Sequence, residues 1–117
     1  KKNDFLPFKD QKSLFAMTAH IIYESIDPIN TATHSKKIIS IIRNKIRFKN
    51  VIISDDVSMK GLKFTIEKNT IKAFIAGCNL VLHCNGRMSE MIKVAKNSPK
   101  LDSFLMKKTS EFYKLIS

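Results

Sequence analysis

The stretch VIISDD at residues 51–56 decides the expected fold, because it is a short apolar run that ends in two carboxylates. A strand of a parallel sheet that is covered on both faces requires this nearly continuous hydrophobicity. Two other runs have the same character: SLFAMTAH at 13–20 and NLVLHC at 79–84. We therefore expect three parallel strands, the middle one spanning residues 50–55.

Helical patterns lie between and after these runs. Ser35 is a good N-cap for a helix that carries Ile38, Ile39, Ile42 and Ile46 on one face. A second helix is predicted over 65–76, followed by Gly77 at the position where a helix favours a left-handed residue. The remaining helices are predicted over 87–97, with an apolar stripe of Met88, Met91, Ile92 and Ala95, and over 101–116.

Alternating strands and helices predict an α/β fold with a parallel sheet. The 117 residues suffice for one domain, and the chain has no linker or repeat that would divide it. Three parallel strands are few for such a sheet, whereas a complete (β/α)8 barrel takes about 250 residues. The expected architecture is therefore the C-terminal part of a TIM-type (β/α)8 barrel, with residues 1–117 as one unit and an N-terminal portion absent.

The net charge of +11 raises the question of a nucleic-acid partner. Lysines supply 18 of the 21 basic residues and are spread along the whole chain, whereas recognition of phosphates and bases favours arginine. No apolar run approaches the roughly 18 residues of a membrane span. We expect neither a nucleic-acid nor a membrane partner. Cys78 and Cys84 match no zinc pattern, and we expect both to be buried, reduced thiols of a cytoplasmic protein.

Asp55 and Asp56 fall at the carboxyl end of the middle strand, where α/β sheets and barrels carry their sites. Side chains alternate along a strand, so the two carboxylates face different ways. One can point at a ligand while the other caps the following turn, and capping is also the ordinary structural explanation for either of them. No histidine or further carboxylate stands nearby at metal-ligand spacing, so no metal is expected.

Four motifs together resemble the last third of a family-3 glycoside hydrolase, in particular the bacterial β-N-acetylglucosaminidases that recycle peptidoglycan fragments. They are LPF at 6–8, AMTAHIIY at 16–23, VIISDDVSMKG at 51–61 and AGCNLVLHCNG at 76–86. The resemblance implies a (β/α)8 barrel that needs no cofactor. It also implies cleavage of terminal β-linked N-acetylglucosamine with retention of configuration.

The resemblance assigns roles to individual residues. Asp55 matches the nucleophile, which attacks the anomeric carbon and forms a covalent glycosyl-enzyme; Asp56 takes a supporting role. Met59 matches a methionine near the sugar site, although a gap-filling thioether is an equal alternative. His20 is a candidate substrate contact, with a structural imidazole as the alternative, and His83 is expected in the core.

The chain also departs from the family pattern. The acid/base histidine of the family lies near an upstream K-H-F-P-G stretch, which this sequence lacks, so we expect the chain to be inactive alone and to need a separate N-terminal half of the barrel. Arg47 replaces a usual glycine and Asn79 a usual aspartate. The alternative function is a non-catalytic remnant or a basic module that binds anionic polymers.

Overall fold

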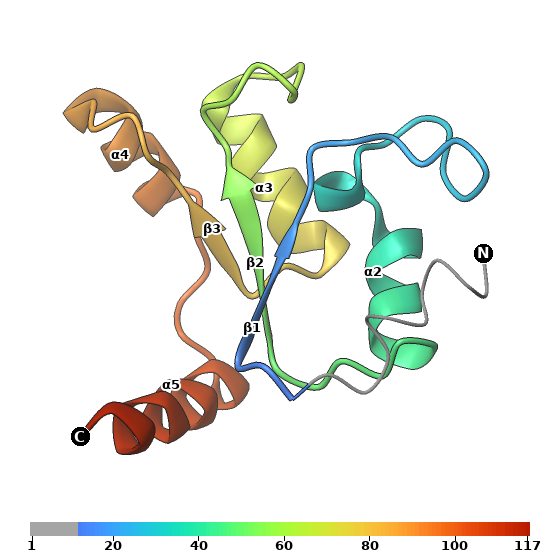
Figure 1. The fold of residues 1–117 in the computed structure, drawn as a ribbon. Coiled ribbons are helices and arrows are strands. Elements are labelled where there is room, and N and C mark those ends of the chain that lie inside the picture. The colour runs from blue at the N-terminus through green and yellow to red at the C-terminus, as the bar shows by residue number, and fades with distance from the viewer. Residues whose placement is uncertain (1–11) are drawn as a thin grey trace.

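The computed structural model describes residues 12–117 and has an α/β fold built on a three-stranded parallel sheet (Figure 1). The strands are β1 (Phe15–Thr18), β2 (Val51–Asp56) and β3 (Leu80–Leu82), in the spatial order β1-β2-β3. All three predicted strands are confirmed, although β1 and β3 are shorter than the apolar runs from which they were predicted. The LPF motif at 6–8 lies outside the described residues.

The predicted helices also form, and their ends carry the expected caps. The Ser35 hydroxyl accepts a hydrogen bond from the Ile38 amide, and Thr65 caps the next helix in the same way. Gly77 has a φ of 122°, and a Cβ atom there would lie 2.9 Å from Ile39 Cγ2, so the position suits only glycine. No helix in residues 12–117 has the length and apolarity needed to cross a membrane. The elements are η2 (Ala32–His34), α2 (Lys36–Asn44), α3 (Ile66–Ala76), α4 (Met88–Lys96) and α5 (Ser103–Ile116).

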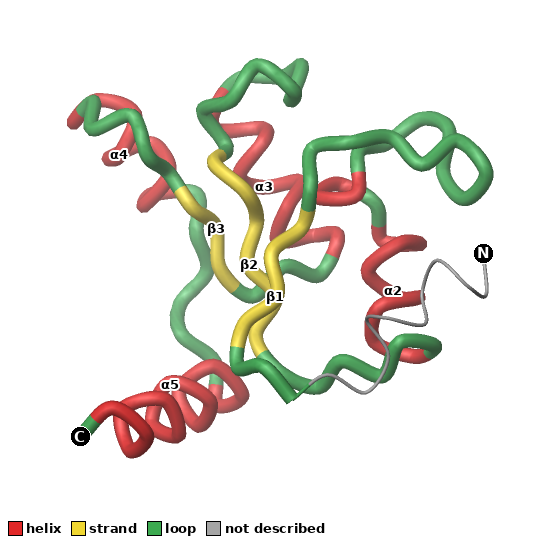
Figure 2. The backbone as a smooth tube through the Cα atoms, in the orientation of Figure 1, coloured by secondary structure: helices red, strands yellow, loops and turns green. Residues whose placement is uncertain are grey.

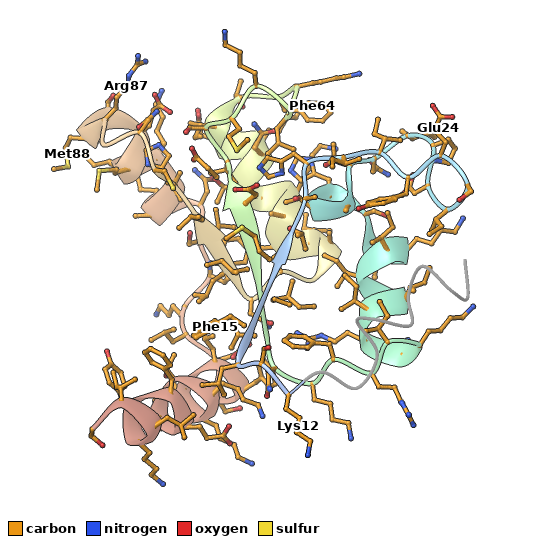
Figure 3. The ribbon with its side chains drawn as sticks, in the orientation of Figure 1. Lys12, Phe15, Glu24, Phe64, Arg87 and Met88 are labelled. Carbon is orange, nitrogen blue, oxygen red and sulfur yellow. The ribbon has the colours of Figure 1, made fainter. Side chains whose placement is uncertain are left out.

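The two faces of the sheet differ in their cover. On one face, Ile52 is fully buried in a cluster with residues of α2, α3 and the loops beside them. On the other face of β1, Phe15 is 38% exposed and Met17 is 58% exposed, although Phe15 meets the ring of Phe112 in α5 at 5.5 Å. Figures 2 and 3 show α5 at the amino end of the strands, near Phe15. The buried cluster around Ile52 comprises Ile39, Phe48, Ile52, Ala73, Ala76 and Cys78.

Helix α4 forms where predicted, but its apolar stripe is not covered. Met88 is 66% exposed, Met91 43% and Ile92 47%, and no residue of α4 is buried. Among the described elements, α3 is the one that α4 contacts closely. A row of large apolar side chains on one helical face normally packs against a neighbouring element. The exposed stripe therefore marks a second incompletely covered region, next to β3.

Arg43 joins the amino ends of β2 and β3. Its guanidinium donates to the carbonyls of Phe48 (3.0 Å) and Asn50 (2.6 Å) and to Asn79 Oδ1 (2.7 Å). Asn79 Oδ1 also accepts the amide of Ile52 at 2.9 Å. Burial lowers the pKa of the Arg43 guanidinium, and all the acceptors named here are neutral. Asn79, at the position where the family resemblance implies an aspartate, therefore brings no negative charge to this cluster.

Arg47 adopts a backbone conformation that suits glycine. Its φ is 61°, the one positive value for a non-glycine residue in the described part of the chain. Left-handed geometry brings the Cβ of an L-residue close to the carbonyl oxygen and costs about 1–2 kcal/mol. The expectation that a side chain now occupies a turn designed for glycine is confirmed by this φ.

We predict that Arg47→Gly raises the free energy of unfolding by about 1 kcal/mol relative to Arg47→Ala, because both variants lose the arginine side chain and only glycine relieves the backbone. Urea denaturation followed by circular dichroism measures the difference. Equal midpoints for the two variants would show that the turn carries no strain.

We predict that Asn79→Asp raises the free energy of unfolding at neutral pH by about 1 kcal/mol, because a carboxylate gives Arg43 a charged acceptor and keeps the bond to the Ile52 amide. The pKa of the new carboxyl group is lowered in the folded state, so the gain is present above its unfolded pKa and is lost as the pH falls. Asn79→Ala is the control and should cost about 2 kcal/mol, because it leaves a buried amide unpaired. Denaturation series at neutral and acidic pH test this, and a gain that persists in acid contradicts the explanation.

Candidate active site

The pairing of β2 with β3 slips at the point where the two carboxylates stand. Ile53 pairs with Leu80 and Asp56 with Leu82, so three steps along β2 match two along β3. The hydroxyl of Ser54, which is fully buried, compensates by accepting the Leu82 amide at 3.1 Å. An irregularity of this kind re-aims side chains at the end of a strand. It separates the roles of the two adjacent aspartates.

Asp55 is half-buried at the end of β2 and keeps one carboxylate oxygen available. Its Oδ1 accepts the Asp56 amide at 2.8 Å, and its backbone carbonyl accepts the Ser54 hydroxyl at 2.8 Å. Its Oδ2 has no hydrogen-bond partner among residues 12–117. A carboxylate that is oriented through one oxygen and open at the other can act as a nucleophile or accept a proton.

Asp56 is occupied by the turn that follows. Its carboxylate accepts the Ser58 amide (3.0 Å), the Ser58 hydroxyl (2.7 and 2.8 Å) and the Cys84 amide (3.1 Å). Burial opposes ionisation, but these hydrogen bonds outweigh it and lower the pKa of Asp56. Asp56 therefore caps the turn and ties it to the chain beyond β3, which is the supporting role expected for it.

The His20 side chain links the end of β1 to the end of β2 through hydrogen bonds. Its Nε2 donates to the Asp56 carbonyl at 2.8 Å, and its Nδ1 lies 2.8 Å from the hydroxyl of Thr33. Thr33 is fully buried and also lies 2.9 Å from the Thr18 hydroxyl. Both ring nitrogens of His20 thus have partners within the chain. This geometry favours the structural alternative, and a contact between His20 and substrate stays a prediction.

Met59 lies on the loop between β2 and α3 and is 46% exposed. Its amide donates to the Asp56 carbonyl at 3.1 Å. Two residues on, a Cβ atom at Gly61 would lie 3.0 Å from the Cβ of His20, so the loop passes tightly over the end of β1. The exposed thioether of Met59 is free to meet a ligand, and its predicted sugar contact stays a prediction.

The two cysteines lie in different environments. Cys78 is buried, and burial raises the pKa of its thiol to about 11. Cys84 is exposed, which corrects the expectation that both thiols are buried, because β3 ends at Leu82 and Cys84 lies beyond the strand. Partial desolvation and the charges of Asp56 and Asp55 raise the pKa of the Cys84 thiol. Cys84 therefore lies beside the two carboxylates.

Several residues of this site were not singled out in the sequence. Ser58 was detectable, because an aspartate two residues before a serine is a common turn pattern. Ser54 and Thr33 act through contacts with distant segments, for which no local signal exists. Within residues 12–117, no three histidine, cysteine, aspartate or glutamate side chains gather in a way that would hold a metal ion. The chemistry that the described residues offer is that of the Asp55 carboxylate.

Comparison with known proteins agrees with this geometry. Residues 1–110 match the family described as glycosyl hydrolase family 3 N terminal domain. A beta-hexosaminidase of Nitrosomonas eutropha is 38% identical over 90 residues, which cover 73% of this chain and 26% of that protein. A beta-hexosaminidase of Photobacterium profundum is 31% identical over 126 aligned residues, which cover 99% of this chain and 38% of the relative. The chain thus spans well under half of these relatives.

Solved structures give the same relationship. The β-N-acetylglucosaminidase of Thermotoga maritima matches with a TM-score of 0.63 and 28% identity, over 89% of this chain and 25% of that one. The β-N-acetylhexosaminidase of Beutenbergia cavernae matches with a TM-score of 0.62 and 26% identity, over 74% of this chain and 25% of that one. With its fold, its strand-end carboxylates and its family match in agreement, the chain belongs to glycosyl hydrolase family 3.

Proposed function

We propose that this chain is the nucleophile-bearing portion of a cytoplasmic β-N-acetylhexosaminidase that removes terminal β-linked N-acetylglucosamine from peptidoglycan fragments with retention of configuration. Asp55 attacks the anomeric carbon while the bond to the leaving oxygen breaks, and a donor outside this chain protonates that oxygen. Water then attacks the anomeric carbon and gives its proton to the same external group, now acting as a base, while the bond to Asp55 breaks and its carboxylate is released. The observation that carries the proposal is the Oδ2 of Asp55 at the carboxyl end of β2, which has no hydrogen-bond partner among residues 12–117.

The surroundings of Asp55 support this assignment over its neighbour. Asp56 uses its carboxylate to hold Ser58 and Cys84, so an attack by Asp56 would break the turn that shapes the site. Asp55 makes no such bridge to a distant segment. The chain lacks the histidine loop that the family resemblance implies for proton transfer, and general acid–base help is worth about 10²–10⁴-fold. The chain alone is therefore proposed to be close to inactive.

A chimera tests the role of Asp55: the matching segment of the Photobacterium profundum relative is replaced by this chain and assayed with a chromogenic β-N-acetylglucosaminide. Asp55→Asn should lower kcat by about 10⁶-fold, the scale on which an enzyme loses activity without its covalent nucleophile. A fluorinated N-acetylglucosamine derivative that traps the glycosyl-enzyme should label Asp55, as read by peptide mass spectrometry.

Asp56→Asn is the matched control for this experiment, because it changes the adjacent carboxylate and leaves Asp55 in place. It should destabilise the loop but leave the label on Asp55. Undiminished turnover in Asp55→Asn, or a label on any other residue, would refute the assignment.

We infer further that the rest of the barrel packs against this chain at both edges of its sheet. β1 and β3 are edge strands, each with one side unpaired within residues 12–117. The face of β1 that carries Phe15 and Met17 and the stripe of α4 that begins at Met88 expose large apolar side chains. Parallel sheets are ordinarily covered on both faces, so these surfaces fit the missing strands and helices of one barrel. A separate chain or a longer form of this one would both supply them.

We predict that the corresponding N-terminal portion of the relative binds this chain in a one-to-one complex, measurable by size-exclusion chromatography with light scattering. Met17→Lys should weaken the complex at least about tenfold, because a charge would be buried among apolar side chains. Ile29→Lys is the control, because Ile29 is 82% exposed on the loop between β1 and η2 and not on a strand. Equal affinity of the Met17→Lys and Ile29→Lys variants would contradict the proposed interface.

A further inference from the structure

Two buried hydroxyl groups lie beside His20, and the proposed reaction does not use them. Thr33, on η2, is fully buried, and Thr18, at the end of β1, is 5% exposed. Their hydroxyl oxygens lie 2.9 Å apart, and the Thr33 hydroxyl lies 2.8 Å from His20 Nδ1. The Thr33 amide also donates to the Ala19 carbonyl at 3.3 Å, so η2 lies beside the end of β1 (Figure 1). Buried polar groups in direct contact form a network in which each member orients the next.

The partners of His20 determine where the protons of this network lie. Its Nε2 faces the Asp56 carbonyl at 2.8 Å, and a carbonyl only accepts, so Nε2 carries a proton. In the neutral ring Nδ1 is then an acceptor, and the Thr33 hydroxyl donates to it, since the other acceptor of this hydroxyl, the Ala19 carbonyl, is farther away at 3.2 Å. Thr33 has a single hydroxyl proton, so Thr18 is the donor between the two threonines. The hydrogen bonds therefore run in one direction, from Thr18 through Thr33 and His20 to Asp56.

The backbone of Asp56 connects this network to the proposed nucleophile. The Asp56 carbonyl accepts His20 Nε2 at 2.8 Å and the Met59 amide at 3.1 Å. The Asp56 amide, on the other side of the same Cα atom, donates to Asp55 Oδ1 at 2.8 Å, which is the one hydrogen bond of the Asp55 carboxylate within residues 12–117. Each of the three steps from Thr33 to Asp55 is thus a hydrogen bond of 2.8 Å. A displaced Asp56 carbonyl would turn the amide that orients Asp55.

The loop after β2 lies directly against His20. A Cβ atom at Gly61 would lie 3.0 Å from the His20 Cβ and 3.3 Å from the His20 carbonyl oxygen, which is closer than such atoms ordinarily approach. His20 therefore contacts this loop with its Cβ and carbonyl oxygen while both of its ring nitrogens have partners. A reacting group is held to within about 0.5 Å when its supporting side chains are locked by packing and hydrogen bonds. The surroundings of His20 provide both.

We propose that Thr33 is a positioning residue for the reaction: through His20 it fixes the backbone of Asp56 and thereby the orientation of the Asp55 carboxylate. The effect on turnover rests on the proposed function, whereas the coupling between Thr33 and the Asp56 amide does not. A displacement of about 1 Å at a reacting group can cost about 10²-fold in rate. Because Thr33 is fully buried, its loss should lower kcat and leave KM unchanged.

The active chimera tests this role with Thr33→Val, which keeps nearly the same side-chain shape and removes the hydroxyl. This variant should lower kcat by between about tenfold and about 10²-fold, because His20 Nδ1 loses its donor and the Asp56 carbonyl is no longer held in one place. Thr33→Ser restores a hydroxyl at the same position and should recover most of the lost kcat. A Thr33→Ser chimera as slow as Thr33→Val would overturn the proposal.

Thr70→Val is the matched control, because Thr70 is also fully buried and its hydroxyl donates within α3, to the Ile66 carbonyl at 2.8 Å. It should lower the midpoint of thermal unfolding to a similar extent as Thr33→Val and leave kcat unchanged. Equal kcat values for the Thr33→Val and Thr70→Val chimeras would show that the Thr33 hydroxyl only stabilises the fold, and would overturn the proposal.

Two variants of His20 test the same connection without altering Thr33. A glutamine amide can donate to the Asp56 carbonyl in place of Nε2, whereas a methionine of similar length cannot. His20→Gln should therefore retain a larger share of kcat than His20→Met. Equal losses of kcat in the two variants contradict the proposal. A raised KM with unchanged kcat would instead identify His20 as a substrate contact and would also overturn it.

Nuclear magnetic resonance of the full 117-residue chain, labelled with ¹⁵N, separates the coupling from the reaction. The resonance of the Asp56 amide should move in Thr33→Val and keep its position in Thr70→Val. An Asp56 resonance that does not move in Thr33→Val would overturn the coupling. If the resonance moves but the unaltered chimera has no glycosidase activity, the proposed function alone is refuted. An active chimera that is insensitive to Thr33→Val would refute only the role of Thr33.

Discussion

The geometry of the site depends on how β2 ends against a shorter neighbour. Buried backbone groups must be paired, and between Ile53 and Asp56 three steps along β2 match only the two steps from Leu80 to Leu82 along β3. The Ser54 hydroxyl and the Asp56 carboxylate accept the amides of Leu82 and Cys84 in place of backbone partners. The Asp56 carboxylate therefore has a structural role. Asp55, one residue earlier, keeps a carboxylate oxygen without a partner in the described part of the chain, so the slip in strand pairing separates the two acids.

The same chain is well packed on one side of its sheet and open on the other. Ile52 and its neighbours form a core with α2 and α3, and the Arg43 guanidinium gathers oxygens from three segments at the amino end. Met17 and the apolar stripe of α4 have no comparable cover in the described residues. This division is the one expected when a helix-covered section of a barrel is viewed without the strands that would close it. It agrees with the family relationship and with the share of the relatives that this chain spans.

The sequence alone predicted the elements well because their signals are local. Apolar runs marked all three strands, the cap at Ser35 marked where one helix begins, and Gly77 marked where the next one ends. The carboxylate pair was placed correctly at the end of the middle strand. The end of β3 was not predicted, because it depends on the slip in pairing with β2, and the exposure of Cys84 follows from it. The hydrogen bonds of Thr33 were also not predicted, because its partners are far away in sequence.

The contrast between the two thiols has a practical consequence. Cys78 is shielded and resists deprotonation, whereas Cys84 is accessible and its backbone amide donates to Asp56. A sulfhydryl-directed fluorophore would thus attach at a single natural position beside the acid pair, without an engineered cysteine. The unaltered polypeptide carries its own attachment point for an optical reporter of changes where β2 and β3 end.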